Sequence, residues 1–176
     1  MQILLNPLNL ADDEVAVFAY GSNMLAARIR SRAAAAKPVG AAILERFKLR
    51  WNKRSQDGSG KCTIEETGRP DDFVWGVLYG LGPDEKKRLD QAEGLGRGYG
   101  ERSVTVLWDA KRLRVIVYYA TSIDPAIKPY EWYRDLVVAG AREHDLPSQY
   151  VASLEATSTV TDPDAERVAR AREYLG

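Results

Sequence analysis

The sequence predicts a single α+β domain built around a small mixed, barrel-like β-sheet with flanking helices. The chain has 176 residues, of which 45% are hydrophobic and 28% charged, and these values are near the average for globular proteins. A chain of this length can bury about 70% of the surface that its unfolded form exposes, so a self-sufficient core is expected. Strand patterns with inserted helices come first and a helical tail follows. This order favours the α+β class.

The first predicted elements are a buried strand and a helix. Residues 15–20 form a short run of β-branched and aromatic side chains that stops at Gly21, which is typical of a strand ending in a tight turn. Ser22 and Asn23 are good N-cap residues for a helix that follows at once. The alanine-rich stretch after it permits helix, but a break is expected near Lys37, because a residue before proline disfavours the helical conformation.

The middle of the chain predicts three strands and a helix. Residues 47–51 alternate apolar with basic side chains, which is the pattern of a strand with one wet face. A short strand is expected at residues 62–66 and a stronger one at 73–81, where the almost wholly apolar sequence indicates that both faces are buried. A helix then begins at Pro83 and stops at Gly94.

The last third predicts a hairpin followed by three helices. The hairpin strands are expected at residues 102–108 and 113–121, with a turn at the sequence DAKR. Helical patterns cover residues 129–143, 146–156 and 162–175. We therefore divide the chain into an N-terminal arm at 1–14, a domain at 15–157, and a helical extension at 158–176 that packs on the same domain.

The composition excludes several classes of function. The 25 Lys and Arg residues balance 25 Asp and Glu residues, so no strong field would attract nucleic acid or an anionic membrane. A single cysteine, Cys62, rules out a disulfide framework and is expected to be a small buried hydrophobe. One histidine, His144, leaves little metal or triad chemistry. The sequence shows neither a signal segment nor a membrane span, so a soluble cytoplasmic protein is expected.

Tyr20, Gly21, Ser22 and Asn23 form the first candidate site, at the junction between strand and helix. The first N–H groups of a helix have no partner within it, and with the helix dipole they can hold a carboxylate. Gly21 lets a ligand approach the backbone closely, and Ser22 adds a hydroxyl. A plain connection, in which Ser22 or Asn23 only caps the helix, explains the same residues.

Glu93 is the second candidate. It follows Leu89 by four residues, so it lies on the side of the helix that is expected to face the core. Partial burial and the helix C-terminus both favour its use as a proton acceptor. Four glycines between residues 94 and 100 leave room for a ligand. The alternative is an exposed last-turn glutamate before a C-cap glycine.

Tyrosines and the histidine are weaker candidates. Two alternatives explain Tyr99, Tyr130 and Tyr133. Their hydroxyls could serve a pocket as neutral hydrogen-bonding groups, or the side chains could pack in the core with their hydroxyls hydrogen-bonded. The spacing of these tyrosines does not separate the two alternatives. A hydrolase with Ser22 as nucleophile and His144 as base is a further alternative. His144 lies in the charged stretch REHD, however, and is expected to be exposed.

Several motifs in order resemble the γ-glutamylcyclotransferase family, including its bacterial and plant relatives. The resemblance spans residues 15–154 and rests on a series of segments rather than on one motif. These are FAYGSNM with Arg28, the strand with Phe47, Leu49, Trp51 and Asn52 followed by Ser55, VWGVLY at 74–79, LDQAEG at 89–94, and Tyr133 followed by GAREHDLPSQY at 140–150.

The resemblance implies a fold and a reaction. Enzymes of this family have the small mixed barrel of the γ-glutamylcyclotransferase-like fold, and they convert a γ-glutamyl amide to 5-oxoproline and a free amine without metal or cofactor. It implies that Glu93 is the general acid and base. It also implies that Gly21, Ser22 and Asn23, with Tyr20 beside them, hold the glutamyl group. Tyr99 and Tyr133 match pocket tyrosines of the family.

The expected partner is therefore a small-molecule γ-glutamyl substrate, without nucleic acid or membrane, bound by a monomer or homodimer. γ-Glutamyl amino acids, γ-glutamyl amines and a γ-glutamylated natural product all remain open as substrates. A non-catalytic relative that binds a small carboxylate, in an interaction or regulatory role, is the alternative function.

Overall fold

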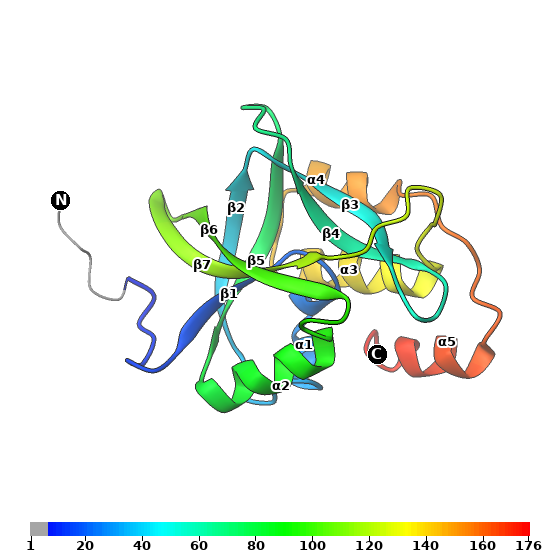
Figure 1. Ribbon diagram of the computed structural model, residues 1–176, viewed down its shortest axis with the longest axis horizontal. Coiled ribbons are helices and arrows are strands. Elements are labelled where there is room, and N and C mark those ends of the chain that lie inside the picture. The colour runs from blue at the N-terminus through cyan, green and yellow to red at the C-terminus, as the bar shows by residue number, and fades with distance from the viewer. Residues whose placement is uncertain (1–6) are drawn as a thin grey trace.

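A closed five-stranded barrel forms the centre of the computed structural model, which describes residues 7–176 (Figure 1). Residues 1–6, the start of the expected N-terminal arm, lie outside the described residues. The strands follow one another around the barrel as β1 (Val15–Ala19), β5 (Phe73–Leu81), β2 (Lys37–Glu45), β6 (Tyr99–Trp108) and β7 (Lys111–Ala120). All pairs are antiparallel except β1 with β7, which is parallel. The predicted fold class is confirmed.

Strand β5 lies between β1 and β2 and is buried on both faces, as its apolar sequence predicts. Val77, Leu78 and Tyr79 are all 0% exposed. Gly76 allows the neighbouring strand to approach closely, because a Cβ atom at this position would lie 2.4 Å from the carbonyl oxygen of Ala19. The end of β1, where the first candidate site begins, is thereby fixed against the centre of the sheet.

Strand β2 is an element that the sequence analysis missed. The expected helix break near Lys37 is instead the start of a nine-residue strand. Pro38 is accommodated because it stands at the second position of the strand, beside an irregularity in the pairing with β5 between residues 38 and 40. Pairing with β5 along the whole strand outweighs the helical preference of its alanines, which is a weak local bias.

The helix after β1 is shorter than expected, and its cap is different. Ser22–Met24 form a single 3-10 turn, and α1 covers only Ala26–Arg30. Neither Ser22 nor Asn23 caps α1 with its side chain. The backbone N–H of Ala26 donates instead to the carboxylate of Glu143 at 2.7 Å. The cap therefore comes from a residue more than a hundred positions away, so local sequence gives no sign of it.

Flanking elements surround the barrel (Figure 1). Strands β3 (Phe47–Arg54) and β4 (Gly60–Glu66) form a separate two-stranded sheet. Helix α2 (Pro83–Glu93) ends at Gly94 in the left-handed conformation, as predicted. The remaining helices are α3 (Glu131–Glu143), α4 (Ser148–Glu155) and α5 (Ala165–Arg172). None of the helices in residues 7–176 has both the length and the hydrophobicity needed to cross a bilayer.

Candidate functional site

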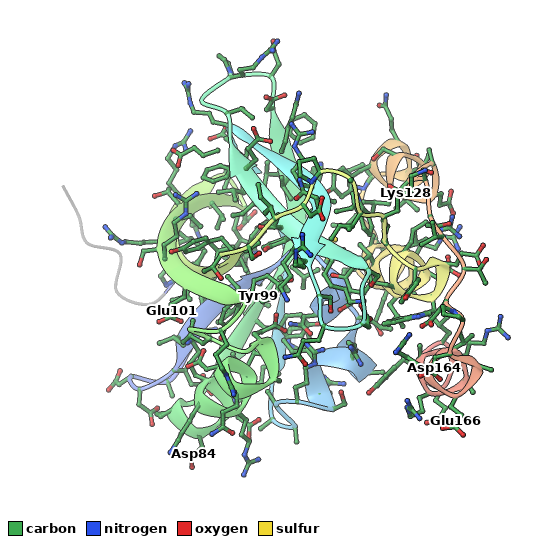
Figure 2. The ribbon with its side chains drawn as sticks, turned by 45° about the vertical axis from the view of Figure 1, so that its right-hand side comes forward. Asp84, Tyr99, Glu101, Lys128, Asp164 and Glu166 are labelled. Carbon is green, nitrogen blue, oxygen red and sulfur yellow. The ribbon has the colours of Figure 1, made fainter. Side chains whose placement is uncertain are left out.

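A pocket of about 170 Å³ lies where the end of β1, α1, α2 and the β3–β4 sheet meet. In Figure 2, Tyr99 marks this region near the middle of the molecule, whereas Asp84, Asp164 and Glu166 lie at its edge. The structure brings the seven residues that the resemblance implies for the site to the wall of this one pocket. These are Tyr20, Gly21, Ser22, Asn23, Glu93, Tyr99 and Tyr133. Their roles in catalysis and binding stay predictions. The other candidate tyrosine, Tyr130, does not line the pocket, and its hydroxyl donates to the Asp57 carbonyl at 2.9 Å.

Glu93 is held at the pocket wall by two neighbours. Leu89, one turn earlier in α2, is 0% exposed and anchors this face of the helix. The Oε1 atom of Glu93 accepts a hydrogen bond of 2.8 Å from the side-chain amide of Asn23. It also forms an ion pair with Arg32, whose Nη1 atom lies 3.1 Å from Oδ1 of Asn23. The three side chains form a closed triangle that fixes the carboxylate.

Arg32 is a site residue that sequence reasoning missed. It follows α1 in an irregular segment, so no periodicity marks it, and it is 61 residues from Glu93 in the chain. It gives the Glu93 carboxylate, whose side chain is 10% exposed, a cationic partner at the pocket wall.

The turn after β1 presents backbone donors to the pocket. Among the described residues, the N–H groups of Gly21, Ser22 and Asn23 donate to no backbone carbonyl. A Cβ atom at position 21 would lie 3.1 Å from both the Tyr133 hydroxyl and Cβ of Cys62, so a side chain here would press on two pocket walls. Gly140 lets α3 pack tightly behind the turn, since its own Cβ would lie 2.5 Å from the Leu25 nitrogen.

Three buried tyrosines frame the pocket. The Tyr99 hydroxyl donates to the Cys62 carbonyl at 2.9 Å, and the Tyr20 hydroxyl donates to the Tyr118 carbonyl at 2.6 Å. The Tyr133 hydroxyl accepts from the Cys62 N–H at 3.0 Å, which leaves its own proton free to donate. Burial raises the pKa of Tyr20, Tyr99 and Tyr133 well above the usual value, so these hydroxyls stay neutral.

Four cationic side chains line the same pocket: Arg28, Arg32, Lys53 and Lys61. Lys61 pairs with Asp57 at 2.8 Å, and Arg32 pairs with Glu93. Within residues 7–176, Arg28 and Lys53 have no ion pair with a carboxylate. Burial lowers the pKa of both groups, which reflects the cost of holding each charge without a counter-ion. The pocket therefore favours an anionic ligand.

His144 lies outside the pocket, whereas Cys62 lies in its wall. The expectation that His144 is exposed is wrong, because its side chain is only 14% exposed and its Nε2 atom lies 3.1 Å from the Tyr79 hydroxyl. It does not line the pocket that holds Ser22. Cys62 is buried as expected, and burial raises the pKa of its thiol to about 12. No group of three or more potential metal-binding side chains occurs in the described part of the chain.

Residues 73–154 match the AIG2-like family. The γ-glutamylcyclotransferase of Homo sapiens is 34% identical over 146 residues, covering 79% of this chain and 76% of that protein. The γ-glutamylcyclotransferase of Bos taurus is 33% identical over 144 residues, covering 78% and 75%. A solved structure of a γ-glutamyl cyclotransferase superposes with a TM-score of 0.80 at 29% identity, covering 89% of this chain and 96% of that one.

Proposed function

Because the chain belongs to the γ-glutamylcyclotransferase family, and is thus an enzyme of this type, we propose that it converts a γ-glutamyl amide to 5-oxoproline and a free amine. The observation that carries this proposal is the position of Glu93, which is fixed by Asn23 and Arg32 at the wall of the pocket. The same wall carries backbone N–H groups that donate to no backbone carbonyl of residues 7–176. A carboxylate held in this way can move protons within a bound substrate.

The proposed reaction is intramolecular. The α-amino nitrogen of the γ-glutamyl group attacks the carbonyl carbon of its own side-chain amide, so a C–N bond forms and closes a five-membered ring. The C–N bond to the acceptor amine then breaks. The attacking ammonium loses two protons as it becomes the ring N–H. Glu93 takes these protons in turn and gives them to the departing nitrogen, which leaves as an ammonium, so no water or electron is exchanged. The protein supplies geometry and proton transfer, and geometry alone can be worth about 7–11 kcal/mol.

The pocket donors suit the charges of this substrate. The free N–H groups at Gly21–Asn23 and the Tyr133 hydroxyl are placed to stabilise an oxyanion or to hold the α-carboxylate. Arg28 and Lys53 are two separate cations without carboxylate partners in the described residues. A γ-glutamyl amino acid carries two carboxylates and can satisfy both cations. We therefore propose γ-glutamyl amino acids as better substrates than γ-glutamyl amines.

The test is a 5-oxoproline assay on γ-glutamyl amino acids and amines with the wild type, Glu93→Gln and Glu101→Gln. Glu101 is an exposed carboxylate on β6 that does not line the pocket, so Glu101→Gln is the matched control. We expect Glu93→Gln to lose about 100- to 10,000-fold in kcat, which is the usual contribution of general acid–base catalysis. Thermal unfolding of each variant shows whether the fold is kept.

Two outcomes would contradict the proposal. Release of glutamate in place of 5-oxoproline would indicate a hydrolase. If no compound turned over but a γ-glutamyl compound bound equally well to the wild type and to Glu93→Gln, the protein would be a binding relative of the family rather than an enzyme.

A further inference from the structure

The C-terminal segment folds back against the elements that carry the pocket. Helix α5 lies beside α3 at the edge of the molecule, and the chain ends close to α1 (Figure 1). Asp162 fixes the start of this segment: its carboxylate accepts from Nε1 of Trp132 at 2.8 Å and from Arg167 at 2.5 Å. Trp132 in turn faces the pocket residue Lys61, whose Nζ atom is 4.5 Å from its ring centroid.

Tyr174 brings the end of this segment to a second pocket cation. The Cζ atom of Arg28 lies 5.0 Å from the centroid of the Tyr174 ring, within the range of a cation–π contact. The Tyr174 hydroxyl donates to Oγ of Ser31 at 3.2 Å, so the ring is fixed to the end of α1. The Tyr174 ring therefore covers one face of the Arg28 guanidinium, although Tyr174 does not itself line the pocket.

Arg28 needs such a support. Its Nε atom is buried and has no hydrogen-bond partner among the described residues. No carboxylate in residues 7–176 forms an ion pair with it, and the nearby Arg32 repels it. A long side chain without an ion pair among the described residues can rotate away. The Tyr174 side chain, which contacts the guanidinium, therefore keeps its charge at the pocket wall.

We propose that Tyr174 is a positioning residue, which holds Arg28 in the orientation that meets an anionic group of the substrate. The inference rests on the proposed function for its substrate and extends it to the C-terminal segment, which lies outside the family resemblance at residues 15–154. The segment after residue 157 is then part of the binding machinery rather than only a cover for the core.

The test compares Tyr174→Ala, Tyr174→Phe and Val168→Ala with a γ-glutamyl amino acid as substrate. Loss of a cation–π contact should raise KM about 3- to 30-fold in Tyr174→Ala with kcat within about twofold. Tyr174→Phe keeps the ring and should restore most of the affinity. Val168 lies on α5 and packs against the core, so Val168→Ala controls for loosening of the helix. An equal KM change in Val168→Ala would overturn the proposal.

A double-mutant cycle shows whether Tyr174 acts through Arg28. Arg28→Met removes the charge and keeps a long apolar side chain. We expect Tyr174→Ala to have no further effect on KM in the Arg28→Met background, and independent, multiplying effects would overturn the proposal.

A binding titration separates this proposal from the proposed function. The same γ-glutamyl amino acid is titrated into Glu93→Gln with and without Tyr174→Ala, which measures affinity without turnover. A wild type without turnover contradicts the proposed function alone, whereas unchanged affinity after Tyr174→Ala contradicts the positioning role alone.

Discussion

Arg32 forms an ion pair with Glu93 inside the pocket, and both side chains contact Asn23 of the turn after β1. A single triangle thus ties α2, the segment after α1 and the first candidate site together. The carboxylate proposed to transfer protons is oriented by a cation and by an amide that belong to different elements. Its position depends on tertiary structure, not on α2 alone.

Replacement of Arg32 by a neutral residue should lower kcat more than it raises KM. We expect Arg32→Ala to lower kcat about 10- to 100-fold, because a carboxylate displaced by about 1 Å loses its alignment with the reacting nitrogen. Arg32→Lys should recover part of the loss. Steady-state kinetics with a γ-glutamyl amino acid measures both, and Arg30→Ala on the exposed face of α1 is the control. A rise in KM with unchanged kcat would show that Arg32 acts on the substrate rather than on Glu93.

Lys53 should discriminate between substrates. Its Nζ atom lies 4.7 Å from the centroid of the Tyr99 ring at the pocket wall. We expect Lys53→Met to raise KM for γ-glutamyl amino acids about 10-fold, the typical effect of losing a hydrogen bond to a charged group. KM for γ-glutamyl amines, which lack the second carboxylate, should change less than about twofold. Lys111→Met, on the exposed start of β7, serves as control. An equal loss for both substrate classes contradicts the assignment.

Gly21 should not tolerate even a methyl group. Its Cβ would lie 3.1 Å from the Tyr133 hydroxyl and from Cβ of Cys62, so Gly21→Ala must shift one pocket wall. We expect a loss of about 1–3 kcal/mol in the free energy of unfolding, as for other overpacked sites, together with a lower kcat/KM. Denaturant unfolding and the 5-oxoproline assay check this. Gly82→Ala is the control, because a Cβ there meets no atom within 4 Å. Equal effects at both glycines would show that backbone entropy, not packing, is responsible.

Asp162 should make the stability of the C-terminal segment dependent on pH. The Arg167 guanidinium, through its hydrogen bonds, holds the pKa of the Asp162 carboxyl well below its usual range. A group with a lowered pKa in the folded state stabilises the fold above its unfolded pKa of about 3.9, and this contribution is lost as pH falls toward the folded value. We expect Asp162→Asn to lower Tm by a constant amount between pH 7 and pH 5.

The Tm difference between the wild type and Asp162→Asn should then shrink below about pH 4. Glu166→Gln, at an exposed position of α5, should match the wild type at every pH. A difference that persists unchanged at pH 3 would mean that packing of the side chain, not its charge, fixes the segment.

Local sequence rules predicted those features that depend on neighbours in the chain. The stop of α2 at Gly94 needs only a glycine in the left-handed conformation, and burial of Glu93 beside Leu89 needs only helical spacing. Strand β2 was missed because the helix-permissive alanines before it and Pro38 within it give no local strand signal, and pairing with β5 and β6 makes it a strand. The cap of α1 by Glu143 could not be found for the same reason.

The sequence predicted the motif residues of the candidate site but not its cationic residues. Tyr20 to Asn23 follow a strand in a recognisable sequence, and they line the pocket together with Glu93. Arg32 and Lys53 come from segments in which a basic side chain usually faces solvent, so the sequence indicates nothing unusual about them. Only the fold brings them to the same cavity.

Parallel pairing of β1 with β7 joins Val17 to Ile116, residues that are about a hundred positions apart. Such a contact closes a long loop, and because of its entropic cost we expect it to form late in folding. The turn after β1 continues directly from that strand, so we expect the pocket to form only when the barrel closes. A partly folded chain would have helices and hairpins but no affinity for ligand. The rate at which ligand binding returns during refolding would therefore measure the rate of barrel closure.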